Sequence, residues 1–275
     1  MSEGRALSTR KELSTVLHTP AVRTRFDEML GKRSAAFISS IISAVNSNQY
    51  LRDCEPMSVV SAAAVAASMD LPINPSLGFA HIVPYDGSAQ FQIGWKGFVQ
   101  LAMRSGQYKT INITPVYEGQ IKKHNPFTGE MEFDSSVVSE KTAGYLLYFK
   151  LLNGYEKYFY MTKDQCLAHG KKYSRSFKKG KGVWVDDFDS MALKTVAKLG
   201  LSKYGILSVD MQRAIELDQA EVDENMNTKY IDAESQVTDS PAEAINKKIR
   251  AKKSEVVQPA PVEQSQAPLA EENHF

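Results

Sequence analysis

The stretch GYLLYFKLLNGYEKYFYM, residues 144–161, decides the fold class. Two runs rich in aromatic and aliphatic residues, Gly144–Leu152 and Tyr155–Met161, flank the dipeptide Asn153-Gly154. This dipeptide favours a type I′ turn between antiparallel strands, so the stretch predicts a β-hairpin. Alternation predicts that one face of the first strand belongs to the core rather than to a base-stacking surface. The residues on that face are Tyr145, Leu147 and Phe149.

Outward from this hairpin, the chain predicts further strands on the N-terminal side and helices at both ends. Asp86-Gly87-Ser88 is a second hairpin signal, and Lys109–Tyr117 alternates like a strand. Apolar residues at three-and-four spacing predict helices elsewhere. The expected helices are Leu13–Leu30, Ala35–Leu51, a segment after Pro56, Trp95–Arg104, Lys163–Ser174, Asp186–Ser202 and Val209–Val222. Helices, then strands, then helices indicate an α+β fold with antiparallel hairpins, not a parallel α/β sheet.

The composition is that of a globular protein from a reducing compartment. The chain has 275 residues, 43% of them hydrophobic, and its two cysteines, Cys54 and Cys166, are too few for a disulfide framework. No apolar run approaches the length of a membrane span, and the polar start lacks a signal-peptide core. We therefore expect a cytoplasmic protein.

Charge divides the chain into a basic body and an acidic tail. Residues 1–213 carry 27 basic and 19 acidic residues, whereas residues 214–275 carry 6 and 13. The predicted boundary is a core at 1–222 and a mostly disordered tail at 223–275. Within the tail, Ser240-Pro241-Ala242-Glu243 resembles a helix start, so a short partner-binding helix is expected at 241–253. A basic body favours a polyanionic partner, although opposite charges can also simply maintain solubility.

Sequence signals for catalysis are weak. None of the three Gly-Lys pairs has a glycine five positions earlier, so the chain lacks a Walker A loop, and ATP-driven strand exchange is not expected. The five histidines are scattered without the spacing of a metal site, so neither metal nor cofactor is predicted.

A magnesium-dependent nuclease is an alternative that the acidic cluster at Asp186, Asp187 and Asp189 keeps open. No Asp-x-Lys or Glu-x-Lys occurs in the chain, which removes the commonest carboxylate-lysine nuclease signature. These aspartates stand where a helix is expected to begin, and exposed helix amides stabilise negative charge there. Helix capping is therefore the preferred interpretation.

The strongest signal for a nucleic-acid partner is a basic segment between residues 171 and 181. Six cations and no acid fall within eleven residues, with Tyr173, Phe177 and Trp184 interleaved or adjacent. Cations neutralise phosphates, and aromatic faces stack on bases of any sequence. A solvated basic loop is the alternative interpretation. The cations are Lys171, Lys172, Arg175, Lys178, Lys179 and Lys181.

The helix that follows adds Lys194 and Lys198, one turn apart on the flank of an apolar stripe. No acid lies three or four residues from either lysine. Because like charges at this spacing destabilise a helix, we expect a phosphate to compensate them.

A third feature is Gly94-Trp95-Lys96-Gly97, between an expected strand and an expected helix. Glycines allow a ligand to approach the backbone closely, and first-turn amides with Lys96 can bind an anion. The alternative is a tight strand-to-helix turn. If the glycines admit a nucleic acid, Gly97→Val should abolish function and leave the fold intact. Arg104 and Lys109 would extend this positive surface.

These residues together resemble the RecT family of phage and prophage single-strand annealing recombinases. The similar motifs are Phe91–Gly97 with Leu101-Ala102 and Arg104-Ser105-Gly106, then Val183-Trp184, Met191-Ala192, Lys194-Thr195 and Lys203-Tyr204, with Asp53-Cys54 to Met57-Ser58 also fitting. The resemblance covers about Pro20 to Arg213. Trp95 stands where a tyrosine is common in the family.

The resemblance implies a non-catalytic, ATP-independent DNA-binding protein that anneals complementary strands in recombination. It implies that the core at 1–222 serves DNA binding, annealing and oligomerisation, and that this core is related to Rad52-like annealing proteins. It also implies self-association into rings or helical filaments. It also implies a 5′-3′ exonuclease partner, and the acidic tail suggests a further contact with a host single-strand-binding protein. A single-stranded nucleic-acid-binding protein that does not anneal remains the main alternative.

The predicted DNA-binding residues follow from these features. They are Lys96, Gly97, Arg104, Lys109, Lys178, Lys179, Lys181, Lys194, Lys198 and Arg213, with Trp95, Phe177 and Trp184 as base-stacking candidates. A chain ending near Asn225 is expected to keep binding and annealing, and to lose coupling to other proteins.

Overall fold

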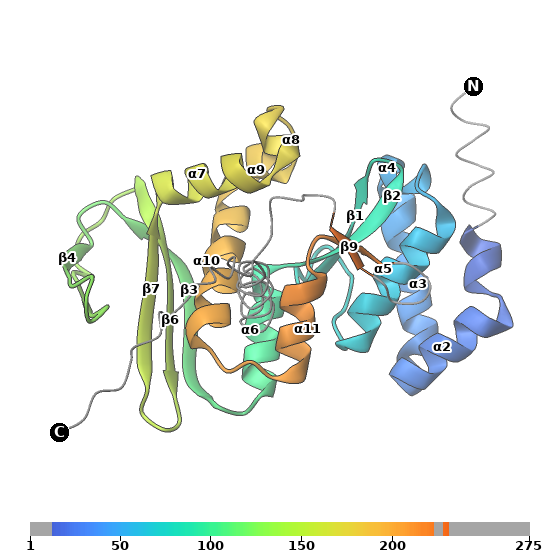
Figure 1. Cartoon of the computed structure of the whole chain (residues 1–275), viewed down its shortest axis with the longest axis horizontal. Helices are drawn as coiled ribbons and strands as arrows, with labels where there is room; N and C mark the ends of the chain where they lie inside the picture. Colours follow the sequence, from blue (N-terminus) through green and yellow to red (C-terminus); the bar gives the residue numbers. More distant parts are fainter. Residues whose placement is uncertain (1–12, 223–227, 231–275) are drawn as a thin grey trace, which may run out of the picture. The chain divides into compact units, whose positions relative to one another are not determined.

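The computed structural model describes residues 13–222 and 228–230. All of them belong to one compact unit, Met1–Glu234, in which helices and antiparallel strands are combined as predicted (Figure 1). Residues 13–17 are helical. The further helices are α2 (Pro20–Leu30), the short 3-10 helix η1 (Gly31–Arg33), α3 (Ser34–Ser47), α4 (Gln49–Arg52), α5 (Pro56–Ser68), α6 (Trp95–Arg104), α7 (Lys163–Tyr173), α8 (Arg175–Lys178), α9 (Val183–Asp186), α10 (Phe188–Tyr204) and α11 (Val209–Leu217). The strands are β1 (Ala80–Tyr85), β2 (Ser88–Ile93), β3 (Tyr108–Tyr117), β4 (Ile121–His124), β5 (Met131–Phe133), β6 (Thr142–Leu151), β7 (Glu156–Thr162), β8 (Ala220–Val222) and β9 (Thr228–Tyr230).

The central sheet has the order β3-β6-β7, and all its pairs are antiparallel. Strands β6 and β7 form the hairpin predicted from residues 144–161. The turn differs from the prediction, because a type I′ turn needs positive φ at both central residues. Only Gly154 has it, with φ +92°, and the strands are joined by a wider loop in which Leu151 N donates to Tyr155 O.

The β1–β2 hairpin has the tighter turn. Asp86 and Gly87 have φ values of +49° and +84°, and Tyr85 pairs directly with Ser88. This two-residue connection fixes the register along the hairpin, in which His81 pairs with Gln92. The hairpin signal at Asp86-Gly87-Ser88 is therefore confirmed.

The core lies between the inner face of the central sheet and α10, and continues to α5. Tyr145, Leu147 and Phe149 are fully buried, which confirms the predicted inner face of β6. They share one hydrophobic cluster with Ala192 and Val196 of α10. Every residue of α5 from Val59 to Ala67 is buried, because small side chains let neighbouring elements approach this helix closely.

Local capping explains several helix boundaries. Asn48 interrupts the helix expected over Ala35–Leu51, and its side chain accepts hydrogen bonds from the first amides of α4. Thr162 and Gln165 form a reciprocal capping box at the start of α7. The prediction of a helix to Val222 was wrong: α11 ends at Leu217, and β8 follows. The expected helix at 241–253 lies outside the described residues.

The sequence prediction also missed the strands β4 and β5. The structure places these two short strands on either side of a turn at Asn125–Gly129. In the part of the chain that the structure describes, no helix combines the length and the apolar character needed to cross a membrane.

Candidate nucleic-acid interface

An open groove of about 950 Å³ brings several of the predicted site residues together. One wall comes from the end of α3 and from α4, and the floor from the β1–β2 hairpin. The other wall comes from α9 and the first turns of α10, while the N-terminus of α6 opens into the groove. Segments distant in sequence therefore supply a single surface.

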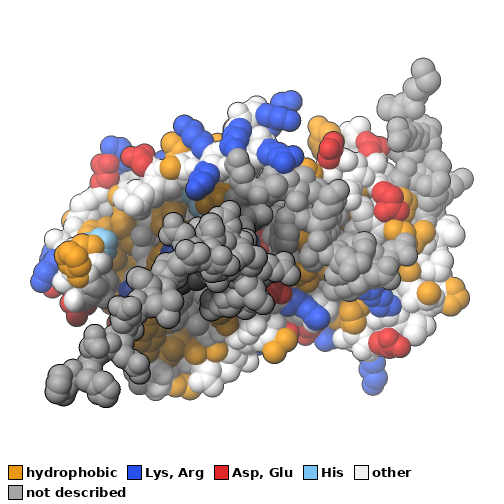
Figure 2. All heavy atoms as spheres, in the orientation of Figure 1, with side chains coloured by type: hydrophobic (Ala, Val, Ile, Leu, Met, Phe, Trp, Pro, Cys, Tyr) orange, Lys and Arg blue, Asp and Glu red, His pale blue; other side chains and the backbone are white. Residues whose placement is uncertain are grey.

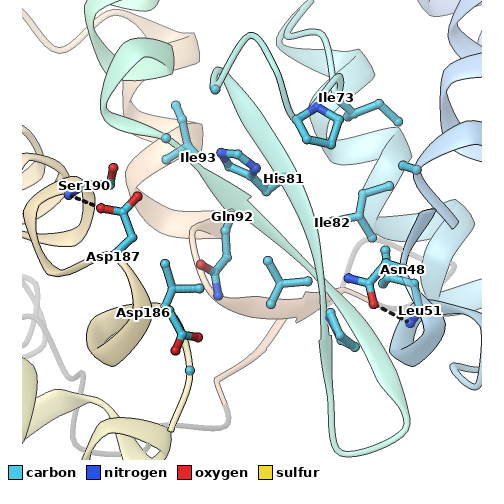
Figure 3. A pocket seen from close by; sticks show the side chains of 18 of the residues that line it. Asn48, Leu51, Ile73, His81, Ile82, Gln92, Ile93, Asp186, Asp187 and Ser190 are labelled. Atoms are coloured by element: carbon cyan, nitrogen blue, oxygen red, sulfur yellow. Dashed lines mark hydrogen bonds between the residues drawn. The ribbon is translucent and has the colours of Figure 1, made fainter.

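The face of the β1–β2 hairpin toward α9 and α10 is polar. His81 and Gln92 are cross-strand neighbours, and Figure 3 shows both on the side of the hairpin that faces Asp186, Asp187 and Ser190. Burial, together with the positive charge of Lys194, lowers the pKa of His81. His81 is therefore neutral near pH 7 and can both donate and accept a hydrogen bond. The sequence analysis did not select His81 or Gln92. Counting outward from the Asp86-Gly87 turn along the two strands would have placed them opposite each other.

Trp95 and Lys96 line the groove at the first turn of α6. Lys96 is exposed, and its ammonium lies 5.7 Å from the centre of the Trp95 ring. The positive end of a helix and a cation together favour an anion at this point. Both residues therefore remain candidates for contact with a nucleic acid.

The packing around Gly97 favours the tight-turn interpretation over close approach of DNA. Gly97 is buried in α6, and a Cβ atom there would lie 2.2 Å from the carbonyl oxygen of Phe79 and 2.6 Å from the side chain of Ile93. The glycine is needed because the helix packs directly on the chain entering β1. The motif Gly94–Gly97 is thus a tight strand-to-helix turn.

The basic segment, residues 171–181, forms the end of α7, then α8 and the turn that follows it. Figure 2 shows Lys and Arg side chains gathered over α7 and α8. Within residues 13–222 and 228–230, no ion pair involves Lys171, Lys172, Lys179 or Lys181, and all four are exposed. Gly182, the residue after Lys181, lines the groove, so the segment borders the groove directly.

Aromatic residues hold this segment in place. Phe177 and Trp184 stack with their ring centres 5.6 Å apart, and the Trp184 ring packs against Gly170 of α7. Trp184 is only 6% exposed and also contacts Phe188 edge-on. The prediction that Trp184 stacks on bases is corrected, because its faces are already covered by protein. Phe177 is half-buried in the same stack.

Lys194 and Lys198 already have an anionic partner within the protein. The Nζ atoms of Lys194 and Lys198 lie 2.8 Å and 2.9 Å from the two carboxylate oxygens of Asp218, which also accepts a hydrogen bond from Ile93 N. The inference that a phosphate must compensate these lysines is therefore wrong: the compensating acid is 24 and 20 positions away in sequence. Lys194 lines the groove, yet its side chain is only 8% exposed.

The pKa values of this cluster reflect the same geometry. Burial alone would raise the pKa of Asp218, but the two ammonium groups hold it below the usual carboxyl range. Burial lowers the pKa of Lys194, and the Asp218 carboxylate opposes that shift. The cluster joins α10, β2 and the segment after α11, so it is first of all a structural link.

The remaining predicted cations lie outside the groove lining. The guanidinium of Arg104 donates to the carbonyl oxygens of Met69 and Asp70, at 2.7 Å each, and therefore fixes the end of α5. Lys109 is exposed on β3, and Arg213 is exposed on α11. The structure gives neither of these two residues a place in the groove.

The acidic residues near α10 have structural partners. Asp187 caps α10 by accepting a hydrogen bond from Ser190 N, and Asp189 accepts one from the Tyr145 hydroxyl. Asp186 and Asp187 line the groove. The capping interpretation of Asp187 is confirmed, and no group of three or more potential metal ligands occurs among the residues the structure describes.

The fold and the groove define the class broadly, as an α+β protein whose groove is bordered by a strongly basic segment. The narrower assignment is that the chain belongs to the RecT family, whose model matches residues 35–232. Over 226 residues the chain is 49% identical to the uncharacterized protein YqaK of Bacillus subtilis strain 168, covering 82% of this chain and 78% of YqaK. It is 29% identical over 188 residues to protein RecT of Escherichia coli strain K12, covering 62% of this chain and 66% of that protein. Family membership implies a role in recombination by single-strand annealing, with single-stranded DNA binding and oligomerisation.

Proposed function

We propose that this chain binds single-stranded DNA along the groove and anneals it to a complementary strand without ATP or any other cofactor, in the cytoplasm of a cell that carries it on a prophage. The observation that carries the proposal is the adjacency of the groove to the basic segment. Exposed lysines without ion pairs border a cavity lined by Trp95 and Lys96. Such an arrangement suits a polyanion, because each bound phosphate releases counterions from the strand.

The chemistry of annealing explains why a mixed groove is useful. The protein must hold the backbone firmly and leave base edges free to pair, because the bases themselves supply specificity. Lysines bind phosphates regardless of sequence, and the exposed part of Trp95 can stack on any base. The neutral imidazole of His81 and the amide of Gln92 can hydrogen-bond to sugar or base groups without adding charge.

The first prediction tests the basic border of the groove. A variant with Lys171, Lys172, Lys179 and Lys181 changed to alanine should bind single-stranded DNA at least about tenfold more weakly at low salt, equally for unrelated sequences. The slope of log affinity against log salt should also become shallower, because fewer phosphates are neutralised. Fluorescence anisotropy with labelled oligonucleotides at several salt concentrations measures both quantities.

A matched control removes the same charge elsewhere. Arg23, Lys32, Lys163 and Lys203 are exposed cations outside the groove lining, so changing these four to alanine should weaken binding far less. Equal losses in the two variants would mean that overall charge, and not this surface, governs binding.

Two alternative functions would give different results in assays with purified protein and oligonucleotides. A non-annealing binding protein would bind single strands in the same assay but would not accelerate pairing of two complementary oligonucleotides without nucleotide. A magnesium-dependent nuclease would degrade labelled single-stranded DNA when magnesium is added. The partners that Asp187 and Asp189 already have make the nuclease the weaker alternative.

The acidic tail is proposed to couple annealing to a 5′-3′ exonuclease and to a host single-strand-binding protein. Strand β9 pairs with β8, so truncation near Asn225 would remove part of the described sheet, and the cut should fall after Glu234 instead. The truncated chain should bind and anneal oligonucleotides at least as well as the full chain, because residues 235–275 carry six acidic and five basic residues and therefore supply no net positive charge for DNA. It should lose recombination in cells. Loss of annealing by the purified truncated chain would contradict this division of roles.

A further inference from the structure

The connection between β3 and β6, residues 118–141, has no role in the groove. It leaves the central sheet, forms the β4–β5 hairpin and returns, and it is called the β4–β5 excursion below. It carries the two most exposed large hydrophobic side chains of the described residues, Phe127 at 97% and Val138 at 95%. Figure 2 shows hydrophobic side chains at the end of the molecule where Figure 1 places β4.

The tip of the excursion holds Phe127 in a defined position. The side chain of Asn125 accepts hydrogen bonds from Phe127 N and Thr128 N, and its backbone accepts one from Gly129 N at 2.8 Å. The hairpin itself is anchored on the outer face of the sheet, where Met131 packs with Val116 and Leu146. An aromatic side chain on such an anchored turn loses little conformational freedom when it binds a partner.

The charge of the excursion does not suit DNA. Its three lysines all form ion pairs within the excursion: Lys122 with Asp134, Lys123 with Glu132 and Lys141 with Glu118. Residues 118–141 contain five acidic residues against these three lysines, which gives a net charge of −2, whereas the other residues up to Arg213 sum to +10. The excursion therefore complements the basic remainder of another copy of this chain and repels a polyanion.

We propose that the β4–β5 excursion is a self-association contact, in which Phe127 and Val138 pack against a second copy of this chain. The two partners supply different surfaces, an excursion on one copy and another face on the next. A contact of this heterologous type produces rings or open filaments, rather than closed dimers. The proposal goes beyond the proposed DNA binding, since it concerns a surface outside the groove.

The first test compares two matched double variants in the full chain. Phe127→Ser with Val138→Ser should raise the concentration for half-assembly by about tenfold or more, as expected for a buried aromatic anchor. Leu152→Ser with Val209→Ser removes two other exposed apolar side chains and should leave assembly unchanged. Sedimentation velocity measures assembly over a range of concentrations, with and without a single-stranded oligonucleotide.

Several outcomes would overturn the proposal. They are unchanged assembly of the Phe127/Val138 variant, an equal loss in the control variant, or a wild-type chain that stays monomeric under both conditions. Binding of a short oligonucleotide, measured by anisotropy on the same samples, should be unaffected. A failure of DNA binding is therefore distinguishable from a failure of self-association.

A second measurement identifies what Phe127 touches. A photoreactive benzoylphenylalanine in place of Phe127 should yield, on irradiation, an adduct with the mass of two chains. Labelled single-stranded DNA is included, so that an adduct with nucleic acid would also be detected. Absence of the two-chain adduct, with or without a DNA adduct, would contradict the assignment.

Discussion

Replacing Asp218 by asparagine should lower the free energy of unfolding by about 3–5 kcal/mol, because it removes the carboxylate that bonds to both Lys194, which is buried, and Lys198, which is half-buried. Asparagine keeps the shape of the side chain, and it can still accept the hydrogen bond from Ile93 N. What is lost is the charge that compensates Lys194, whose side chain is 8% exposed. Urea unfolding followed by circular dichroism measures the difference.

Two controls separate the buried charge from other effects. Asp134→Asn removes an exposed ion pair with Lys122 and should change stability far less. Lys194→Met added to Asp218→Asn should recover part of the loss, because the uncompensated buried charge is then gone. If the double variant is no more stable than Asp218→Asn alone, the charge on Lys194 does not explain the effect.

The pH dependence of stability provides an independent check. The pKa of Asp218 is lower in the folded chain than its ordinary value of 3.8, so its contribution is present above that value and is lost as the pH falls through the folded pKa. In Asp218→Asn this acid-sensitive part should be missing. The free energy of unfolding of Asp218→Asn should rise at alkaline pH, as the pH approaches the ordinary lysine pKa of 10.5 from below. The folded state holds Lys194 with a lowered pKa, so the unfolded state binds more protons in this range.

Local sequence signals were sufficient for most of the secondary structure. Asn153-Gly154 between two aromatic runs predicted the β6–β7 hairpin, and the alternation of Tyr145, Leu147 and Phe149 predicted its buried face. The α6 helix was predicted with its observed bounds, Trp95 to Arg104. The type of turn was harder to predict from the sequence, because the φ angle of Asn153 depends on how the sheet twists around it.

Long-range partners explain what local signals missed at the site. Lys194 looked uncompensated because its acid, Asp218, lies beyond any helical window and was itself assigned to a helix. In the same way, the aromatic residues of the basic segment looked available until Trp184 was found against Gly170 and Phe177. A charge or a ring can be recognised in sequence, but its exposure depends on tertiary packing.

Exposure divides the predicted cations into two groups. Lys96, Lys179 and Lys181 are exposed and stand at or beside the groove lining, whereas the buried lysines serve the fold. Burial of a cation is possible only with a partner, and an exposed lysine keeps its charge for a ligand. This difference gives Lys194 and Lys198 a stabilising role and leaves the basic segment as the proposed binding surface.

Replacing Gly97 by valine should prevent stable folding, and this outcome decides between the two interpretations of the Gly94–Gly97 motif. A Cβ atom at Gly97 would lie 2.2 Å from the main-chain oxygen of Phe79, which cannot move without displacing β1. Alanine in place of a helical glycine normally stabilises a helix by up to about 1 kcal/mol. Here Gly97→Ala should instead destabilise by about 1–3 kcal/mol, as overpacking does, and valine should cost more.

Gln100→Val is the matched control, because it places the same β-branched residue in α6 at a half-buried position. It reports the propensity cost of valine in this helix, which is a few tenths of a kcal/mol. Circular dichroism and thermal unfolding should show a large loss for Gly97→Val and a small one for Gln100→Val. A Gly97→Val chain that stays folded and fails only in DNA binding would restore the DNA clamp. Loss of the fold would instead confirm that these glycines bring α6 against β1, and thereby place Trp95 and Lys96 at the groove.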